Sequence, residues 1–264
     1  MSTSNTSLAE AGAPQDRSAP LLALDGVSKR FGPVQALNSV DLEIPPGKVT
    51  ALIGDNGAGK SSLIKTVSGL WSPDDGEILW EGKPVHPHGP KDSEALGITT
   101  IYQDLALCDN LDIVQNMFLG HEPTQRRLLN ESAMELKARQ TLTELSVTTV
   151  RSIRQPVASL SGGQRQSVAV AKAVMSEAKL VIMDEPTAAL GVAQTAMVLG
   201  LIKTLSSRGV AVLVVSHNLV DVFEVADRIA VLYLGQLVVS APASEFDRQS
   251  AVEYMTTGGA GQTA

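Results

Sequence analysis

Short apolar runs alternate with longer segments in which apolar residues recur every three or four positions. A short apolar run bounded by turn residues is typical of a β-strand, and the longer period is typical of an amphipathic helix. This pattern predicts strands at 21–27, 39–44, 49–53, 77–80, 97–102, 180–183 and 211–216. It predicts helices at 60–68, 111–119, 131–145, 161–176 and 192–207.

The order of these elements predicts a fold of the α/β class. From residue 161 onwards helices alternate with strands, and strand–helix–strand connections favour a mainly parallel sheet. Residues 105–159 are predominantly helical, so we expect an inserted helical subdomain there. Residues 84–93 are rich in proline and glycine and are predicted to be a linker, which contains His86 and His88. No other metal-ligand pattern accompanies these histidines, which favours a solvated loop over a metal site.

The N-terminal residues and the composition indicate where the protein works. Residues 1–20 are polar and lack the apolar core of a signal peptide, so they are predicted to be a disordered arm. The longest strictly aliphatic stretch is 210–215, far shorter than the about 20 residues of a membrane-spanning helix. The single cysteine, Cys108, cannot form a disulfide within the chain, which fits a reducing compartment. These features predict a cytoplasmic protein that reaches a membrane only through a partner.

The charge balance argues against nucleic acid as a partner. The formal net charge is −7, and acidic and basic residues are mixed along the chain. Affinity for nucleic acid depends largely on a basic face that neutralises phosphates. Aromatic residues make up 3% of the chain, which is too few for base-stacking platforms.

The first motif that carries chemistry is a glycine-rich loop between a predicted strand and a predicted helix. It matches the G-x-x-x-x-G-K-[ST] phosphate loop, in which backbone N–H groups and a helix N-terminus face phosphate oxygens. Lys60 is placed to contact the β- and γ-phosphates, and the Ser61 hydroxyl is placed to bind Mg²⁺. The candidate nucleotide-binding residues of this loop are Gly54, Asp55, Asn56, Gly57, Ala58, Gly59, Lys60, Ser61 and the following Ser62.

The second motif is an apolar strand that ends in two carboxylates. Residues 180–183 lead to Asp184 and Glu185 at the carboxyl edge of the predicted sheet, where α/β folds bind ligands. Asp184 is placed to hold Mg²⁺ or its water. Glu185 is the candidate to orient or deprotonate the attacking water.

The third motif is Leu-Ser-Gly-Gly-Gln-Arg-Gln at 160–166, at the start of a predicted helix. Ser161 and the two glycines would expose N–H groups and a hydroxyl, which makes a second phosphate-binding helix end. The same residues are equally consistent with a serine N-cap followed by a flexible hinge. Physical chemistry alone leaves both interpretations open.

These three motifs, in this order and spacing, resemble the ATP-binding cassette proteins over about residues 21–240. The resemblance implies a P-loop NTPase (RecA-like) core with a mainly parallel sheet, an antiparallel β part and an inserted helical subdomain at about 105–159. It implies an ATP-binding domain at 21–245 and a C-terminal tail at 246–264. The ligands that it implies are ATP and Mg²⁺.

The resemblance also implies roles for single residues. Phe31 stands where the family stacks an aromatic ring on adenine, although a core phenylalanine is the alternative. Gln103 matches a glutamine that contacts Mg²⁺ and links two subdomains, so it is also a candidate metal ligand. His217 matches a histidine that contacts the γ-phosphate, and both residues join Glu185 as candidate catalytic residues. The residues implied to meet the nucleotide of an opposing subunit are Ser161, Gly162, Gly163 and Gln164.

One position departs from the family pattern. After Leu190 the family usually places aspartate, and this chain has Gly191. In the family that aspartate belongs to the dimer interface. Its replacement therefore puts communication between two nucleotide sites in doubt, more than hydrolysis itself.

Two stretches, 101–120 and 186–192, resemble the bacterial importers of ribose, xylose and fructose. Many such ATPases carry two cassettes in one chain, whereas this chain carries one, which implies a homodimer. The resemblance further implies integral-membrane permease subunits, an extracytoplasmic sugar-binding protein and a peripheral position on the inner face of the cell membrane. Three alternatives stay open: a transporter of another solute or an exporter, a non-transport cassette protein that acts on ribosomes or DNA, and a regulatory binding subunit without turnover.

Overall fold

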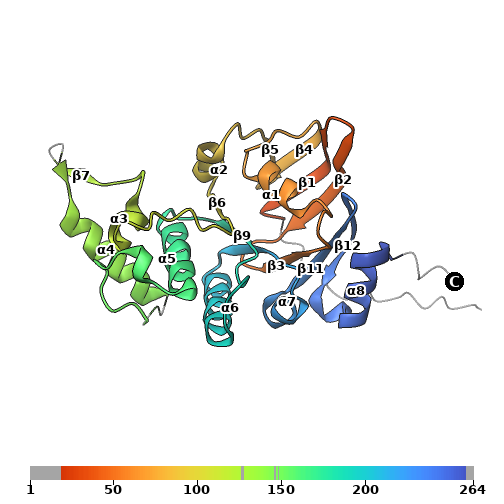
Figure 1. Cartoon of the computed structure of the whole chain (residues 1–264). Helices are drawn as coiled ribbons and strands as arrows, with labels where there is room; N and C mark the ends of the chain where they lie inside the picture. Colours follow the sequence, from red (N-terminus) through yellow and green to blue (C-terminus); the bar gives the residue numbers. More distant parts are fainter. Residues whose placement is uncertain (1–18, 126–127, 146, 148, 260–264) are drawn as a thin grey trace, which may run out of the picture.

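The computed structural model describes residues 19–125, 128–145, 147 and 149–259, so residues 1–18 of the predicted arm lie outside the described part. Figure 1 shows a β-rich lobe and, beside it, a smaller lobe of helices. All strands and helices predicted up to residue 216 are present, and the first two strands are longer than expected. The fold is therefore of the predicted α/β class.

The centre of the β-rich lobe is a six-stranded sheet. Its strands, in spatial order, are β12 (Gln236–Pro242), β11 (Arg228–Tyr233), β3 (Val49–Ile53), β10 (Ala211–Val215), β9 (Leu180–Asp184) and β6 (Ile98–Ile101) (Figure 1). The pair β11–β12 is antiparallel and the other pairs are parallel. Every residue of β3 and β10 is buried, as expected for strands that are covered on both faces. This arrangement confirms the predicted mainly parallel sheet.

An antiparallel sheet and one helix cover one face of this central sheet. The strands, in spatial order, are β2 (Val34–Ile44), β1 (Leu22–Phe31), β4 (Asp75–Trp80) and β5 (Lys83–Val85), and the helix is α1 (Lys60–Val67). In β2 the side chains of Val40, Leu42 and Ile44 are buried, whereas Asp41 and Glu43 between them are exposed. The period of two thus turns one face of β2 inward, and that face packs with α1 and the central sheet in one apolar cluster.

Helices cover the opposite face. They are α5 (Gly162–Met175), α6 (Val192–Ser207), α7 (Leu219–Val225) and α8 (Arg248–Thr257). Helices α5 and α6 share an apolar cluster with β9 and β10, and α7 and α8 share another with β3 and β11. Although α8 lies in the segment that the resemblance assigns to a tail, it packs on the sheet through the buried Ala251. Within the described ranges, no helix has the length and apolar character that crossing a bilayer requires.

The predicted linker at 84–93 is wrong in part. Strand β5 ends inside it, and α2 (Pro90–Leu96) begins inside it. Proline fixes φ near the helical value and lacks only an N–H that would have no acceptor in the first turn, so Pro90 starts the helix instead of preventing it. Asp92 adds a negative charge in that first turn and accepts a hydrogen bond from the His88 N–H at 2.9 Å.

The smaller lobe is the predicted helical insertion. It contains α3 (Ile113–Phe118), the antiparallel pair β7 (Thr124–Gln125) and β8 (Leu128–Leu129), α4 (Glu131–Glu144) and the 3₁₀ turn η1 (Val157–Ser159). A second 3₁₀ turn, η2 (Ala243–Glu245), lies outside this lobe and precedes α8. Asn116 of α3 is buried and organises the preceding turn. Its amide donates to the carbonyl oxygens of Cys108, Leu111 and Asp112 and accepts from the Cys108 N–H.

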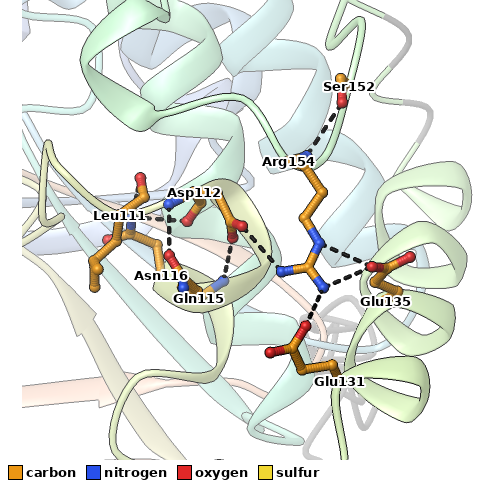
Figure 2. Close-up of polar contacts among 8 residues, drawn as sticks. All are labelled: Leu111, Asp112, Gln115, Asn116, Glu131, Glu135, Ser152 and Arg154. Carbon is orange, nitrogen blue, oxygen red and sulfur yellow. Dashed lines mark hydrogen bonds and ion pairs between the residues drawn. The ribbon is translucent and has the colours of Figure 1, made fainter.

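Arg154 ties the helices of this lobe together (Figure 2). Its guanidinium pairs with Asp112 at the start of α3 at 3.0 Å, and with Glu131 and Glu135 of α4 at 2.9 and 2.6 Å. Hydrogen bonds to Glu135 and then to Asp112 raise the pKa of Arg154, so the guanidinium stays charged. Asp112 also caps α3, because its carboxylate accepts from the Gln115 N–H while the Gln115 side chain accepts from the Asp112 N–H.

We expect Arg154→Leu to loosen the helical lobe, because the substitution leaves three carboxylates without their counter-charge. The melting temperature should fall by roughly 2–4 °C, the shift expected for about 1 kcal/mol in a domain of this size. Hydrogen exchange should become faster in α3 and α4 than in the central sheet. Lys203→Leu breaks the exposed Lys203–Glu224 pair and is the control; equal effects of the two variants would contradict the prediction.

Candidate nucleotide-binding site

Three loops meet at one edge of the central sheet because β3, β10 and β9 are parallel and in register. Val215 at the end of β10 pairs with Leu52 of β3 on one side and with Asp184 of β9 on the other. The residues that follow these strands, among them Glu185 and His217, therefore lie at the same carboxyl edge. The site predicted from separate motifs is brought together by this register.

The glycine-rich loop between β3 and α1 packs closely against neighbouring backbone. A Cβ atom on Gly54 would lie 2.3 Å from the carbonyl oxygen of Leu232, and one on Gly59, whose φ is +107°, would lie 2.6 Å from that of Ala36. Only glycine fits at these two positions. No side chain caps the N-terminus of α1, so the first-turn N–H groups stay available to an anion.

Lys60 is the first residue of α1, and its side chain is buried against the loop. Its Nζ donates to the carbonyl oxygen of Gly54 at 2.7 Å and to that of Asp55 at 3.0 Å. Burial lowers the pKa of Lys60, whereas Glu185, Asp55 and Asp184 act in the opposite direction. A partly desolvated ammonium with only carbonyl partners is well suited to bind a phosphate oxygen.

Asp184 and Glu185 face Lys60 across a cleft of about 570 Å³. Burial, and then the charge of Glu185, raise the pKa of Asp184, while Lys60 opposes that rise. The cleft is lined by Val34, Gln35, Ala36, Asn56, Gly57, Gly59, Lys60, Ser61, Ser62, Gln103, Asp184, Glu185, Leu234 and Gly235. Most of the predicted loop residues, the two carboxylates and Gln103 thus line one cleft.

Glu185 and His217 form a hydrogen-bonded pair. The His217 Nδ1 and the Glu185 Oε1 are 2.7 Å apart, although the two residues are 32 positions apart in the chain. Glu185 has a φ of +49°, in the left-handed region that a residue with a side chain rarely adopts. Its N–H donates to the carbonyl oxygen of Val215 at 2.8 Å, which holds this conformation. Backbone strain that is fixed by a neighbouring strand is a common feature of functional residues.

The residues at the cleft fit Mg²⁺. Ser61, Gln103 and Asp184 offer a hydroxyl, an amide and a carboxylate, and oxygen atoms are the ligands that Mg²⁺ takes. Within the described part of the chain, no three His, Cys, Asp or Glu side chains gather as a metal site. That donor set suits Mg²⁺, which usually takes only one or two ligands from protein and the rest from water and phosphate.

The Ser-Gly-Gly-Gln segment lies elsewhere. It forms the N-terminus of α5. Figure 1 shows α5 next to α4 of the helical lobe and away from α1. Ser161 is an N-cap whose hydroxyl accepts from the Gln164 N–H, and the Gln164 side chain accepts from the Ser161 N–H. The serine N-cap is therefore confirmed, whereas the flexible hinge that was part of the same interpretation stays a prediction. Ser161 and Gly162 are also exposed, so a role of this helix end in phosphate binding stays a prediction.

Phe31 lies at the end of β1 and does not line the cleft. The residue is 39% exposed, so the alternative of a core phenylalanine is wrong. The ring meets Trp71 edge to face at 4.6 Å between centroids, and the Lys29 ammonium lies 5.7 Å from its centre. Stacking of Phe31 on adenine stays a prediction.

The sequence patterns missed the apolar part of the cleft. Val34 begins β2, and Leu234 and Gly235 form the turn between β11 and β12, so all three lie outside the recognised motifs. The glycine Gly235 between two apolar runs could have indicated a turn. Its position next to the phosphate loop depends on the order of strands in the sheet, which no local pattern specifies.

We expect Asp184→Asn to stabilise the chain without nucleotide, because burial and Glu185 disfavour the ionised carboxylate. A pKa raised by folding means that stability is lost as pH rises above the ordinary pKa of an aspartate, so the gain from the substitution should grow as pH rises above about 4. At pH 7 the melting temperature should rise by roughly 2 °C. Asp74→Asn should instead lower the melting temperature at pH 7, because hydrogen bonds from the Lys29 side chain and the Arg30 N–H lower the pKa of Asp74. A lower melting temperature for Asp184→Asn at pH 7 would refute this.

Known proteins are similar to this chain in sequence and in fold. The ABC transporter family model matches residues 37–188. The fructose import ATP-binding protein FrcA of Rhizobium meliloti is 47% identical, over 90% of this chain and 94% of that protein. The xylose/arabinose import ATP-binding protein XylG of Sulfolobus acidocaldarius is 46% identical, with the same coverage of 90% and 94%. A solved ATP-binding cassette of an ABC transporter, in its ADP conformation, has a TM-score of 0.78 at 24% identity and covers 91% of this chain and 96% of its own.

Identity at this level over nearly the whole length, together with a phosphate loop and a carboxylate pair in one cleft, shows that the chain belongs to the ABC transporter family of ATP-binding proteins.

Proposed function

We propose that this protein is the ATP-hydrolysing subunit of a sugar importer and works as a homodimer on separate permease subunits. The observation that carries the proposal is the cleft in which Lys60, Asp184 and Glu185 meet. The relatives described above are named as ATP-binding proteins for import of fructose and of xylose or arabinose, which supports a sugar as the solute.

In this proposal, different groups of the cleft bind the phosphates, hold the metal ion and accept the proton of the attacking water. Lys60 and the N–H groups of the phosphate loop hold the β- and γ-phosphates of ATP. Ser61, Gln103 and Asp184 would hold Mg²⁺, which when bound neutralises charge on the phosphate oxygens. The carboxylate of Glu185 accepts a proton from the attacking water, while the water oxygen bonds to the γ-phosphorus and the bond to ADP breaks.

His217 supports this step from the neighbouring strand. Its hydrogen bond to Glu185 at 2.7 Å fixes the direction of the carboxylate. The His217 side chain is 62% exposed, so it is accessible to a γ-phosphate that enters the cleft. Glu185 and His217 therefore act as one unit.

A homodimer is inferred because the phosphate loop and the start of α5 belong to different parts of one chain. Ser161 and Gly162 at the N-terminus of α5 are exposed, but this helix end lies in a different part of the chain from α1 (Figure 1). Two chains that face each other head to tail would place this helix end on the γ-phosphate held by Lys60 of the other chain. Closure would exclude water and strengthen the electrostatic interactions at the phosphates.

The partners complete an import system. The permease subunits supply the membrane passage, and an extracytoplasmic sugar-binding protein delivers the sugar to them. The ATPase would then be peripheral on the cytoplasmic face of the membrane. Closure of the dimer moves the helical lobe beyond Gln103, and that motion drives the permease.

We expect Glu185→Gln to bind ATP and to lose hydrolysis, because the amide keeps the shape of the side chain but accepts no proton. The variant should accumulate as a closed dimer when Mg²⁺ and ATP are saturating, as measured by size-exclusion chromatography with light scattering. His217→Ala should weaken turnover while Glu185 remains present. Normal turnover by Glu185→Gln would refute the assignment of this residue.

Mixing two inactive variants tests the shared site. Lys60→Met should lose phosphate binding, and Ser161→Arg should block the helix end that faces the partner. In a mixed dimer one site regains both intact halves, so random mixing should restore up to about a quarter of the wild-type rate. The assay uses the protein reconstituted with its permease. If the mixture stays as inactive as either variant alone while light scattering shows mixed dimers, the composite site is wrong.

A further inference from the structure

Leu234 occupies an unfavourable position in the turn between β11 and β12. Its side chain is 71% exposed, and its φ is +46°. Because Tyr233 pairs with Gln236, the turn has only two central residues, and the second, Gly235, has a φ of +81°. Such a hairpin turn requires the left-handed conformation at both positions, which asparagine, aspartate and glycine favour and which leucine rarely adopts.

A leucine here is therefore unfavourable for two independent reasons. The left-handed backbone strains a residue that has a Cβ, and water covers a large apolar side chain. No other described residue covers Leu234, which remains 71% exposed. A ligand that covers Leu234 would supply the missing contact.

The turn is fastened to the phosphate loop. The Gly235 N–H donates to the carbonyl oxygen of Ala58 at 2.8 Å, and the Gly235 carbonyl accepts from the Asn38 N–H at 2.8 Å. Leu234 consequently lines the same cleft as Lys60. Val34, which is 60% exposed, lines this cleft from the start of β2. Two exposed aliphatic side chains from two hairpins thus lie beside a phosphate-binding loop.

The chemistry of the cleft divides it into two regions. The region at Lys60 and Ser61 is polar and suits phosphate oxygens, whereas Leu234 and Val34 offer no hydrogen bonds. The nucleoside is the part of ATP that has apolar faces. We propose that Leu234, together with Val34, contacts the nucleoside of ATP and so raises the affinity of the cleft for a nucleotide over a bare polyphosphate. This inference rests on the proposed function, because it requires ATP in this cleft.

Leu234→Asn separates a binding role from a structural one. Asparagine accepts the left-handed turn, so the melting temperature should stay the same or rise. The affinity for ATP, measured by titration calorimetry, should fall about fivefold to tenfold because an apolar contact is lost. Under turnover the KM for ATP should rise by the same factor, while kcat stays within about twofold.

Two controls make the result specific. Inorganic tripolyphosphate should bind the variant and the wild type equally, because its phosphates contact the loop at Lys60 and not Leu234. Leu128→Asn changes a leucine of the helical lobe that is 74% exposed and should leave the affinity for ATP unchanged.

Each alternative result is informative. Unchanged affinity of Leu234→Asn for ATP overturns the inference and leaves the proposed function standing, provided that the wild type hydrolyses ATP and Glu185→Gln does not. An equal loss of ATP and tripolyphosphate shows that the turn acts by supporting the phosphate loop, which also overturns a nucleoside contact. A wild type that binds ATP without turnover refutes the proposed function, yet the ratio of affinities still decides the role of Leu234.

Discussion

The parallel pairing of β10 with β3 and β9 is the constraint on which the site depends. It places the end of β3, the end of β9 and the end of β10 in one row, so that the phosphate loop, Glu185 and His217 begin at the same edge. A shift of this register by one residue would turn the buried side chains of β10 to the wrong faces. The apolar packing that makes β10 fully buried therefore also fixes the distance between the groups that carry out the chemistry.

Features that lower the stability of the folded chain are concentrated at the carboxyl edge of the central sheet. Lys60 is held with a lowered pKa, Asp184 with a raised one, and Glu185 in the left-handed region. Each of these features makes the folded chain without nucleotide less stable, and in the proposed function a bound polyphosphate and divalent cation would offset the two charge effects. The clusters of apolar side chains on both faces of the sheet hold these groups in place. Leu234 belongs to the same pattern, with strain and exposed apolar surface beside the loop that binds phosphate.

The sequence could predict the parts of the site that are contiguous. The loop from Gly54 to Ser61 and the pair Asp184–Glu185 each sit at the end of an apolar strand, so local pattern and chemistry agree there. The apolar wall of the cleft could not be found in this way, because Val34 and Leu234 become neighbours of Lys60 only through the strand order of two sheets. Helix α2 was missed for a different reason. Proline is common in loops, but it also favours the first turn of a helix, and at Pro90 the helical preference prevails.

The departure at Gly191 can be understood from how α6 begins. Gly191 is the N-cap of α6, a position at which aspartate would serve as cap. Here the Gln194 side chain accepts from the Gly191 N–H at 3.1 Å. The same Gln194 packs so closely on α5 that a Cβ on Gly163 would lie 3.0 Å from its own Cβ. The helix start is thus secured without a carboxylate, and it is in direct contact with the Ser-Gly-Gly-Gln segment. What the replacement removes is an exposed negative charge at a surface that would face the partner chain, while the link within one chain between α6 and α5 is kept.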